Sequence, residues 1–347
     1  QARRRRRRPT TGPKPDRGDF NRLLSRDFNR RGSTTVDLSV VIVSYNTRCL
    51  LDACLSSVFE AGGLSASGDG QARLEVVVVD NGSHDGSADM VRLRYPQAHL
   101  IALTDNVGFA RGSNAGMRAS KGRYLLLLNS DTVVLDQALA RMVSFLDDHP
   151  QFAAIGPLLL NPDGSVQTSC FSFTTVTDIL FESIGLTALF PRSPLFNRRG
   201  LGGFDRAAVR EVDWLSGACL MVRRDVLTSV GLLDEDFFMY GEELDWCYRM
   251  KQAGLRVAFF PGARVIHHGR GSSLRARGEL APRALAGRLR YFRKHHGRGA
   301  VLAVRLLTVV GMSLRLLLLP LRTLARRGNA AGDFAWYWGL LRAALCG

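Results

Sequence analysis

The sequence predicts an α/β fold with a mostly parallel β-sheet flanked by helices. Three short apolar runs, at residues 38–43, 74–79 and 124–128, each end abruptly in polar residues. A short, continuous apolar run is typical of a parallel strand that is buried on both faces. Ligands of open α/β sheets bind where such strands end. We therefore expect three strands that direct polar side chains into one crevice.

The polar residues at these strand ends are suited to a nucleotide-type ligand. The second run is followed by a carboxylate, and the third by an amide, a hydroxyl and a carboxylate. The candidate ligand-binding residues are Ser44, Tyr45, Asn46, Asp80, Asn81, Asn129, Ser130 and Asp131.

Helices are predicted to alternate with these strands. We expect a helix at 49–60, a further strand at 99–103 and a helix at 109–120, with Asn106 and Gly108 in the turn that precedes it. The strands near 74–79, 99–103 and 123–128 start about 25 residues apart, which suits βαβ units of ordinary size.

The pattern is looser after Asp131. Turn signals occur throughout residues 161–210, which we expect to be mixed in structure. Beyond and before that segment the sequence predicts helices at 138–148, 225–230 and 242–253, and strands at 153–160, 218–223 and 256–260.

Charge divides the chain into three parts. The formal net charge is +16, yet residues 1–35 hold twelve Lys and Arg against three acids, and residues 264–347 hold sixteen against two. We expect a disordered Arg- and Pro-rich tail at 1–35, a globular domain at 36–282 and a basic helical region at 283–347. Basic ends favour nucleic acid or lipid headgroups. The acidic middle and the lack of a nucleic-acid-binding motif argue against nucleic acid.

Residues 301–319 approach transmembrane length but contain Arg305 and Arg315. A central arginine costs about 2.5–3.5 kcal/mol on insertion, which argues against a simple span. On a helical wheel both arginines and Thr308 share one side. We expect a helix that lies in a membrane interface with its arginines toward the headgroups and that is interrupted at Pro320. The alternative is a helix packed on the globular domain.

The six cysteines are scattered, most of them in apolar segments, and form no CxxC pair. This spacing argues against a zinc site or a redox motif. We expect reduced, buried thiols in a cytosolic protein.

Seven motifs in order carry a family resemblance. They are SYN at 44–46, DNGSHDGS at 80–87, NVGFA at 106–110, NSD at 129–131, WLSG at 214–217, GEELDW at 241–246 and HHGRGS at 267–272. Together they resemble the family 2 glycosyltransferases with a GT-A fold, a Rossmann-like sheet, and most closely the bacterial rhamnosyltransferase-like branch. The resemblance covers residues 36 to about 275.

The resemblance implies a nucleotide-sugar site at the strand ends, to which Asn106 and Gly108 also belong. The family places a base-reading aspartate at the position of Asp80, where it accepts a hydrogen bond from N3–H of uracil or thymine. Tyr45 would pack on the base. The alternatives are an aspartate that serves a tight turn and an ordinary tyrosine at a strand end.

The resemblance also implies a divalent cation, Mg²⁺ or Mn²⁺, with Asp131 and His267 as its ligands. Family members often have an acid–x–acid triplet here, and Asn129 replaces the first acid. The alternative for the adjacent pair His267 and His268 is an ordinary surface position. Arg249 and Arg270 are weaker candidates for contact with the diphosphate.

Aligned on the family pattern, Glu243 occupies the catalytic base position, where aspartate is usual. The longer side chain leaves Asp245 as an alternative base. Glu242 would bind acceptor hydroxyls, and one of the three acids could instead cap the helix. The acceptor site would further include Trp214, Ser216 and Gly217, with a core tryptophan as the alternative.

These assignments predict an inverting, metal-dependent glycosyltransferase at the cytoplasmic face of the bacterial cell membrane. The preferred donor is dTDP-L-rhamnose, with UDP-galactofuranose, UDP-glucose and UDP-N-acetylglucosamine as alternatives. The acceptor would be a lipid-linked sugar or a cell-envelope glycan, and the C-terminal helices would contact an anionic membrane surface. The competing hypotheses are a polyanion-binding protein and a catalytically inactive scaffold.

Overall fold

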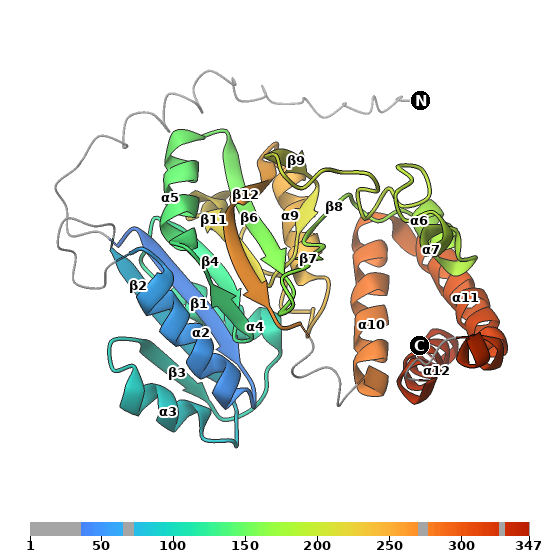
Figure 1. Ribbon diagram of the computed structural model, residues 1–347, viewed down its shortest axis with the longest axis horizontal. Coiled ribbons are helices and arrows are strands. Elements are labelled where there is room, and N and C mark those ends of the chain that lie inside the picture. The colour runs from blue at the N-terminus through green and yellow to red at the C-terminus, as the bar shows by residue number, and fades with distance from the viewer. Residues whose placement is uncertain (1–35, 65–72, 270–276, 326–329, 347) are drawn as a thin grey trace, which may run out of the picture. The chain divides into compact units, whose positions relative to one another are not determined.

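A mixed, mostly parallel β-sheet flanked by helices confirms the predicted α/β fold (Figure 1). The computed structural model describes residues 36–64, 73–269, 277–325 and 330–346, all within one compact unit, Val36–Gly347. The predictions for the tail at 1–35 and for Arg270 lie outside the described residues.

The strands that carry the predicted polar ends lie next to one another in the sheet. The order of the main strands is β3-β2-β1-β4-β11-β6-β12-β5, and the pairs from β3 to β4 are parallel. Their bounds are β1 Leu38–Ser44, β2 Leu74–Asn81, β3 His99–Leu103, β4 Tyr124–Asn129, β5 Thr132–Val134, β6 Phe152–Leu160, β11 Cys219–Arg223 and β12 Arg256–His267. Ser44 is paired with Asp80, and Val43 with Asn129, so these strands end level with one another.

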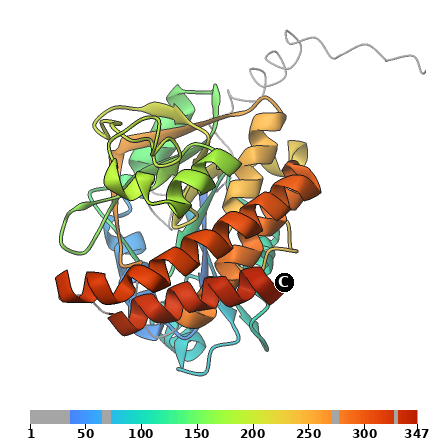
Figure 2. The same ribbon diagram turned by 90° about the vertical axis from the view of Figure 1, so that its right-hand side faces the viewer.

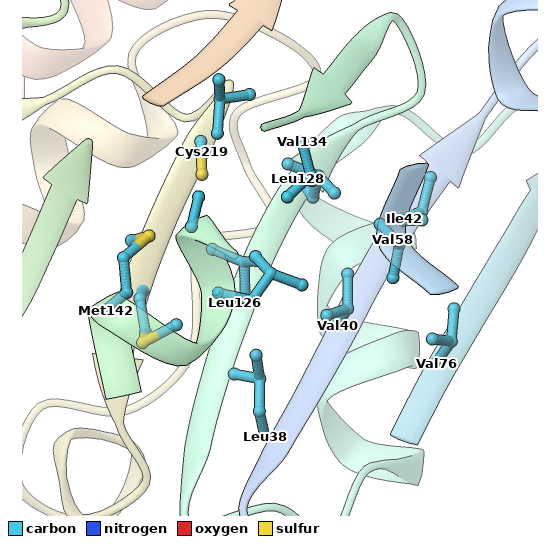
Figure 3. Packing of buried hydrophobic residues seen from close by; sticks show 14 of the residues in the cluster. Leu38, Val40, Ile42, Val58, Val76, Leu126, Leu128, Val134, Met142 and Cys219 are labelled. Atoms are coloured by element: carbon cyan, nitrogen blue, oxygen red, sulfur yellow. The ribbon is translucent and has the colours of Figure 1, made fainter. Parts of the chain in front are cut away.

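Helices cover both faces of the sheet. The alternate residues Leu38, Val40 and Ile42 belong to a core shared with α2 and α5 (Figure 3), whereas Val41 belongs to a second core shared with α4 and α9. This is the period-two alternation of a strand buried on both faces. The helices of this part are α2 Arg48–Ala61, α3 Ser87–Arg94, α4 Phe109–Ala119, α5 Ala138–Asp148, α8 Asp225–Ser229 and α9 Glu242–Gln252.

Residues 161–210 are mixed, as predicted. The helices here are α6 Val176–Ser183 and α7 Leu186–Leu189, and the short strands of this region and its flanks are β7 Val166–Gln167, β8 Cys170–Phe171, β9 Arg210–Val212 and β10 Trp214–Leu215. Helix α6 begins at a capping box in which the Thr175 hydroxyl and the Asp178 carboxylate each accept a hydrogen bond from the other's backbone N–H. β8 and β10 pair in a separate two-stranded sheet.

Three C-terminal helices pack on the rest of the unit (Figure 2). They are α10 Arg277–His295, α11 Gly297–Ala325 and α12 Ala330–Cys346. Helix α10 begins six residues before the predicted start at Arg283, and Pro320 lies inside α11 instead of interrupting it. An apolar cluster that includes Ile179 of α6 and Leu244 of α9 joins all three helices to the α/β part.

The predicted orientation of α11 is wrong. Arg315 points toward α6 and donates a hydrogen bond to the backbone oxygen of Glu182, and Thr308 is buried. The solvent-facing side is apolar instead. We call it the apolar stripe of α11: Leu302, Leu306, Val310 and Leu317, which are 56–75% exposed. By length and composition, residues Gly297–Pro320 form a segment of the described chain that could cross a membrane.

Helix α10 holds the loop that leads into α9. Its Arg290 pairs with Asp236 at 2.5 Å, and its Lys294 pairs with Asp234 at 2.6 Å. Gly287 lies so close to this loop that a Cβ atom added to it would be 1.9 Å from the backbone oxygen of Tyr240. The position of this loop therefore depends on the C-terminal helices.

We predict that Gly287→Ala destabilises the protein although alanine is the better helix former. The clash with a backbone oxygen cannot be relieved by a side-chain rotation, and overpacking costs about 1–3 kcal/mol. Gly299→Ala is the matched control, because nothing lies within 4 Å of a Cβ at that position of α11. Gly299→Ala should raise the melting temperature, because alanine has a higher helix propensity than glycine and meets no neighbouring atom there. A melting temperature of Gly287→Ala at or above wild type would contradict the close approach.

Candidate functional site

Asp80 lies at the end of β2 with one carboxylate oxygen free. The side chain is 3% exposed, and Oδ2 accepts a hydrogen bond from the backbone N–H of Ser83 at 3.2 Å. Oδ1 is buried and has no hydrogen-bond partner among the residues described. An unpartnered buried acceptor is costly, so its persistence points to a ligand that donates a hydrogen bond.

The loop after β1 lies against the loop after β2. Asn46 has φ +53°, and its side-chain oxygen accepts from the backbone N–H of His84 at 2.8 Å. The Ser83 hydroxyl oxygen in turn accepts from the Asn46 backbone N–H at 3.0 Å. Tyr45, the residue between Asn46 and the strand, is 43% exposed and free to contact a ligand.

Asn81, Asn106 and Gly108 support one another. The Asn81 amide donates to Asn106 Oδ1 at 3.1 Å and to the Gly108 oxygen at 3.2 Å. Its own Oδ1 accepts from the Val107 backbone N–H at 3.0 Å. These contacts shape the turn that precedes α4, and they favour a positioning role for Asn81.

Ser44 and Ser130 are buried under the sheet edge. Their hydroxyls each lie 2.9 Å from the hydroxyl of Thr47, which joins the ends of β1 and β4. Thr47 was not among the predicted residues. The two serines therefore tie the strand ends together and point less directly to a ligand.

Asp131 and His267, which are 136 positions apart in the sequence, meet at this edge. His267 Nε2 lies 3.3 Å from Asp131 Oδ1 and 3.3 Å from the Asn129 amide nitrogen. Antiparallel pairing of β12 with β5 places His267 opposite Thr132. The pKa of Asp131 lies below its usual value because hydrogen bonding and charge from His267 outweigh its burial.

The imidazole of His267 is oriented by Gln167, which sequence reasoning missed. Gln167 Oε1 lies 2.7 Å from His267 Nδ1, which leaves Nε2 directed at Asp131. A histidine whose second nitrogen is held in this way is typical of metal-binding sites. The described residues contain no cluster of three or more His, Cys, Asp or Glu side chains suited to a metal ion, so a cation here would rely on oxygens of its substrate and water.

Glu242 and Glu243 open α9, after Gly241 with φ +99°. Glu242 is 5% exposed, and its Oε2 is buried without a hydrogen-bond partner in the described part of the chain. Glu243 is half-buried, and its Oε2 accepts from the Gly241 backbone N–H at 3.2 Å. Burial raises the pKa of both carboxyls, and the charge of Glu243 raises that of Glu242 further. A carboxyl with a raised pKa is a stronger base once it is ionised.

Asp245 is fully buried and contacted by two cationic side chains and an imidazole. Its oxygens lie 2.8 Å from Arg249 Nε, 2.7 Å from His295 Nε2 and 2.9 Å from Lys294 Nζ. These contacts join α9 to α10 and favour a structural role over that of a base. Arg249 is used by Asp245 and by two backbone oxygens, so it is not free to bind a diphosphate.

Gly217 brings the residues before β11 against Glu243. A Cβ at Gly217 would lie 3.6 Å from the Cβ of Glu243, and the backbone N–H of Ser216 donates to the Ser169 oxygen at 2.8 Å. The Trp214 ring stacks on Phe171 at 4.3 Å and donates to the Ser172 oxygen at 3.1 Å. One ring face of Trp214 is therefore already covered by protein.

The thiols are mostly buried, as predicted. Cys54, Cys170, Cys219 and Cys247 are buried and free, whereas Cys49 is free but exposed. Burial raises the pKa of Cys54 and Cys247 to about 12, so neither serves as a thiolate.

Comparison with known proteins places this chain among sugar-transferring enzymes. Residues 39–212 match the protein family described as Glycosyl transferase family 2. A Mycobacterium tuberculosis protein named N-acetylglucosaminyl-diphospho-decaprenol L-rhamnosyltransferase is 29% identical over 245 residues, which cover 67% of this chain and 76% of the relative. The low-salt glycan biosynthesis hexosyltransferase Agl10 of Haloferax volcanii is 27% identical over 237 residues, 67% of each chain.

Two solved structures share the fold. The mannosyltransferase PcManGT from Pyrobaculum calidifontis, in complex with GDP-Man and Mn²⁺, has a TM-score of 0.51 and 17% identity, over 94% of this chain and 92% of its own. GalNAc-T7 with UDP, GalNAc and Mn²⁺ has a TM-score of 0.51 and 18% identity, over 75% of this chain and 48% of its own. The predicted GT-A fold is confirmed.

We predict that Glu242→Gln stabilises the folded protein, and more so at pH 8 than at pH 5. Because the folded-state pKa of Glu242 is raised, the stability that its protonated form supports is lost as the pH rises through that pKa, and glutamine has no such loss. Relief of an unpartnered buried group is worth about 1–3 kcal/mol. Thermal unfolding at both pH values, with the exposed Glu60→Gln as control, measures the difference. An increase in melting temperature that is equal at both pH values would contradict the raised pKa of Glu242.

Proposed function

The chain belongs to glycosyl transferase family 2 and is a glycosyltransferase, and we propose from this premise that it inverts the anomeric centre of a sugar carried by a nucleoside diphosphate. The observation that carries the proposal is the order of groups along one sheet edge. Asp80 ends β2, Asp131 follows β4, and Gly217, in contact with Glu243, precedes β11. Base, diphosphate and reacting sugar would lie along this edge in that order.

Asp80 would read the base. Its free buried oxygen accepts N3–H, a donor that uracil and thymine both carry, and Tyr45 covers the ring from the exposed side. Both dTDP and UDP donors satisfy this contact. The similarity to the L-rhamnosyltransferase of Mycobacterium tuberculosis supports L-rhamnose as the first choice of sugar. UDP-linked galactofuranose, glucose and N-acetylglucosamine remain the alternatives.

Asp131 and His267 would hold the divalent cation. A carboxylate oxygen and an imidazole nitrogen 3.3 Å apart are separated by about the distance expected of neighbouring ligands on one Mg²⁺ or Mn²⁺ ion. An ion held by these two residues would neutralise charge on the leaving diphosphate. The two solved structures that share the fold both contain Mn²⁺, which supports a cation of this class.

Glu243 would remove the proton from the acceptor hydroxyl. Its raised pKa strengthens it as a base, and the backbone N–H of Gly241 fixes one of its oxygens. The free buried oxygen of Glu242 accepts a hydrogen bond from another hydroxyl of the acceptor sugar and thereby orients that sugar. The hydroxyl oxygen would then attack the anomeric carbon on the face opposite the nucleotide, while the bond from that carbon to the diphosphate breaks. The nucleoside diphosphate leaves, and the configuration inverts.

The acceptor would be a lipid-linked sugar or a cell-envelope glycan, reached from the cytoplasmic face of the membrane. The apolar stripe of α11 gives the structural support for membrane contact. The exposed Arg293 and Arg298, at the junction of α10 and α11, add positive charge that suits anionic headgroups. Contact would therefore be made by leucines, with arginines at the margin.

We predict that dTDP or UDP raises the melting temperature in the presence of Mg²⁺ or Mn²⁺. A ligand at about 100 times its dissociation constant adds roughly 2.7 kcal/mol. Asp131→Ala should lose the metal-dependent part of the shift. Glu243→Gln should keep the full shift yet transfer sugar at least about 100-fold more slowly. Sugar transfer by Glu243→Gln near the wild-type rate would overturn the role of Glu243 as the base. A nucleotide-induced rise in melting temperature that is the same with and without the metal would overturn the role of Asp131 as a metal ligand.

We predict that the triple variant Leu302→Gln, Leu306→Gln, Val310→Gln binds phosphatidylglycerol vesicles at least tenfold more weakly than wild type in a flotation assay. Each large apolar side chain that is no longer buried in the membrane costs about 1.5–3 kcal/mol of binding free energy. Leu93→Gln is the control, since Leu93 is 82% exposed but lies on α3. Substitution is preferable to deletion of the helix, because Val301 and Val304 belong to the apolar core shared with α10. Equal flotation of all three proteins would refute the membrane contact.

A further inference from the structure

A cavity of about 720 Å³ lies outside the predicted site. It is enclosed by α6, by β8 and by the segment from Thr187 to Arg206. Its volume falls within the range of about 300–1,000 Å³ that small-molecule sites occupy. None of the seven motifs contributes to its walls, so the motifs could not predict this cavity.

The walls combine guanidinium groups with apolar rings. Arg192, Arg199 and Arg206 line the cavity. The apolar part of the lining is Phe171, Pro191, Phe196, Leu201 and Phe204. Arginine is the preferred partner of phosphate groups, and apolar walls favour a hydrocarbon portion. The combination suits an amphipathic ligand with a phosphate head.

The three arginines lack some or all of the partners that such groups normally have. Across the described ranges of the chain, no hydrogen bond or ion pair joins the side chain of the half-buried Arg199, or that of the exposed Arg192, to another residue. Arg206 Nε is buried and unpartnered there, although its Nη2 donates to the Gly200 oxygen at 3.4 Å. Burial of cationic groups without partners is costly, and a bound anion would remove that cost.

Two of the three acids in the walls are already paired with cations, whereas the third, Asp205, accepts among the described residues only from the backbone N–H of Ala207 at 2.9 Å and offsets one of the three arginines. Asp178 accepts from Arg198 at 2.6 Å and caps α6, and Glu182 pairs with Arg288 of α10 at 3.6 Å. Glu182 offsets only part of the burial cost that lowers the pKa of Arg199. The cavity therefore keeps an excess of positive charge.

A short segment connects the cavity to the reactive site. Thr168 and Phe171 line the cavity. Between and beside them, Gln167 holds His267, Ser169 accepts from Ser216, and Phe171 stacks on Trp214. A ligand in the cavity would thus be separated from the diphosphate and acceptor positions by one layer of chain.

Helix α6 lies between the cavity and α11, the helix that carries the apolar stripe on its opposite, solvent-facing side. Glu182 lines the cavity, and its backbone oxygen accepts from Arg315 of α11. Figures 1 and 2 both show α6 beside α11. A membrane that contacts the stripe would therefore be separated from this cavity by helix α11 and helix α6.

We propose that this cavity binds the diphosphate of a lipid-linked acceptor, with Arg199 and Arg192 as its main contacts. The inference rests on the proposed function and identifies where that acceptor's anionic group sits. The hydrocarbon would run along the aromatic wall toward α11, and the sugar would extend toward Glu242 and Glu243. The donor diphosphate would use the separate site at Asp131.

The test is calorimetric titration of the full chain in EDTA with farnesyl diphosphate and with inorganic pyrophosphate. EDTA removes the cation that the donor site would require. Arg199→Gln and Arg192→Gln should each weaken farnesyl diphosphate binding about tenfold or more. Arg92→Gln, which removes the same charge from an exposed position on α3, should bind like wild type.

Farnesyl diphosphate that binds wild type, Arg199→Gln and Arg192→Gln with one affinity would overturn the proposal. Equal affinity of wild type for pyrophosphate and farnesyl diphosphate would overturn the assignment to a lipid-linked ligand, whereas clear preference for the isoprenoid would support it. Arg199→Gln removes an unpartnered cation, so its melting temperature should not fall.

A second titration, with dTDP or UDP and Mg²⁺, separates this proposal from the proposed function. Arg199→Gln should bind the nucleotide like wild type. Nucleotide binding without any binding of farnesyl diphosphate would overturn the cavity assignment and leave the glycosyltransferase mechanism standing. Arginine-dependent binding of farnesyl diphosphate without nucleotide binding would support the cavity site and overturn the donor site.

Discussion

The arrangement of the site depends on the buried carboxylate of Asp245. It is surrounded by Arg249 of its own helix and by Lys294 and His295 of α10. An ion taken fully out of water is tolerated only when partners satisfy it, and removal of one partner from such a group costs about 3–5 kcal/mol. This network fixes α9 against α10, and with it the first turn of α9, where Glu242 and Glu243 lie. The two catalytic candidates thus owe their position to charges far along the sequence.

Much of the site could be predicted because strand ends are local features. An apolar run followed by Asp80 or Asp131 needs no knowledge of distant residues, and the parallel register then aligns the ends. Gln167 could not be predicted, since its contact with His267 spans 100 positions and involves a two-residue strand. The role of Asp245 was equally hidden: in the sequence it is one of three acids, and only tertiary packing separates it from the other two.

The wrong orientation of α11 has a physical explanation. The helical wheel correctly placed Arg305, Thr308 and Arg315 on one side, but a wheel does not show which side faces protein. Arg315 finds a backbone acceptor at the end of α6, the oxygen of Glu182, which also accepts from the backbone N–H of Ile184. A hydrogen bond to such an acceptor, shielded from water, outweighs exposure of the guanidinium. The leucines are left outside as a consequence, and they mark the surface that needs a partner.

The close approach of Gly287 to Tyr240 has a consequence for how this chain could change over evolution. Since α10 touches the backbone of the loop ahead of Glu242, the C-terminal helices are not an interchangeable anchor appended to an independent enzyme. A recombination that replaced them would have to supply a residue without a side chain at this one helical position and cations for Asp234, Asp236 and Asp245. Exchange of the C-terminal helices between related chains is therefore constrained by the lack of space for a Cβ atom at Gly287.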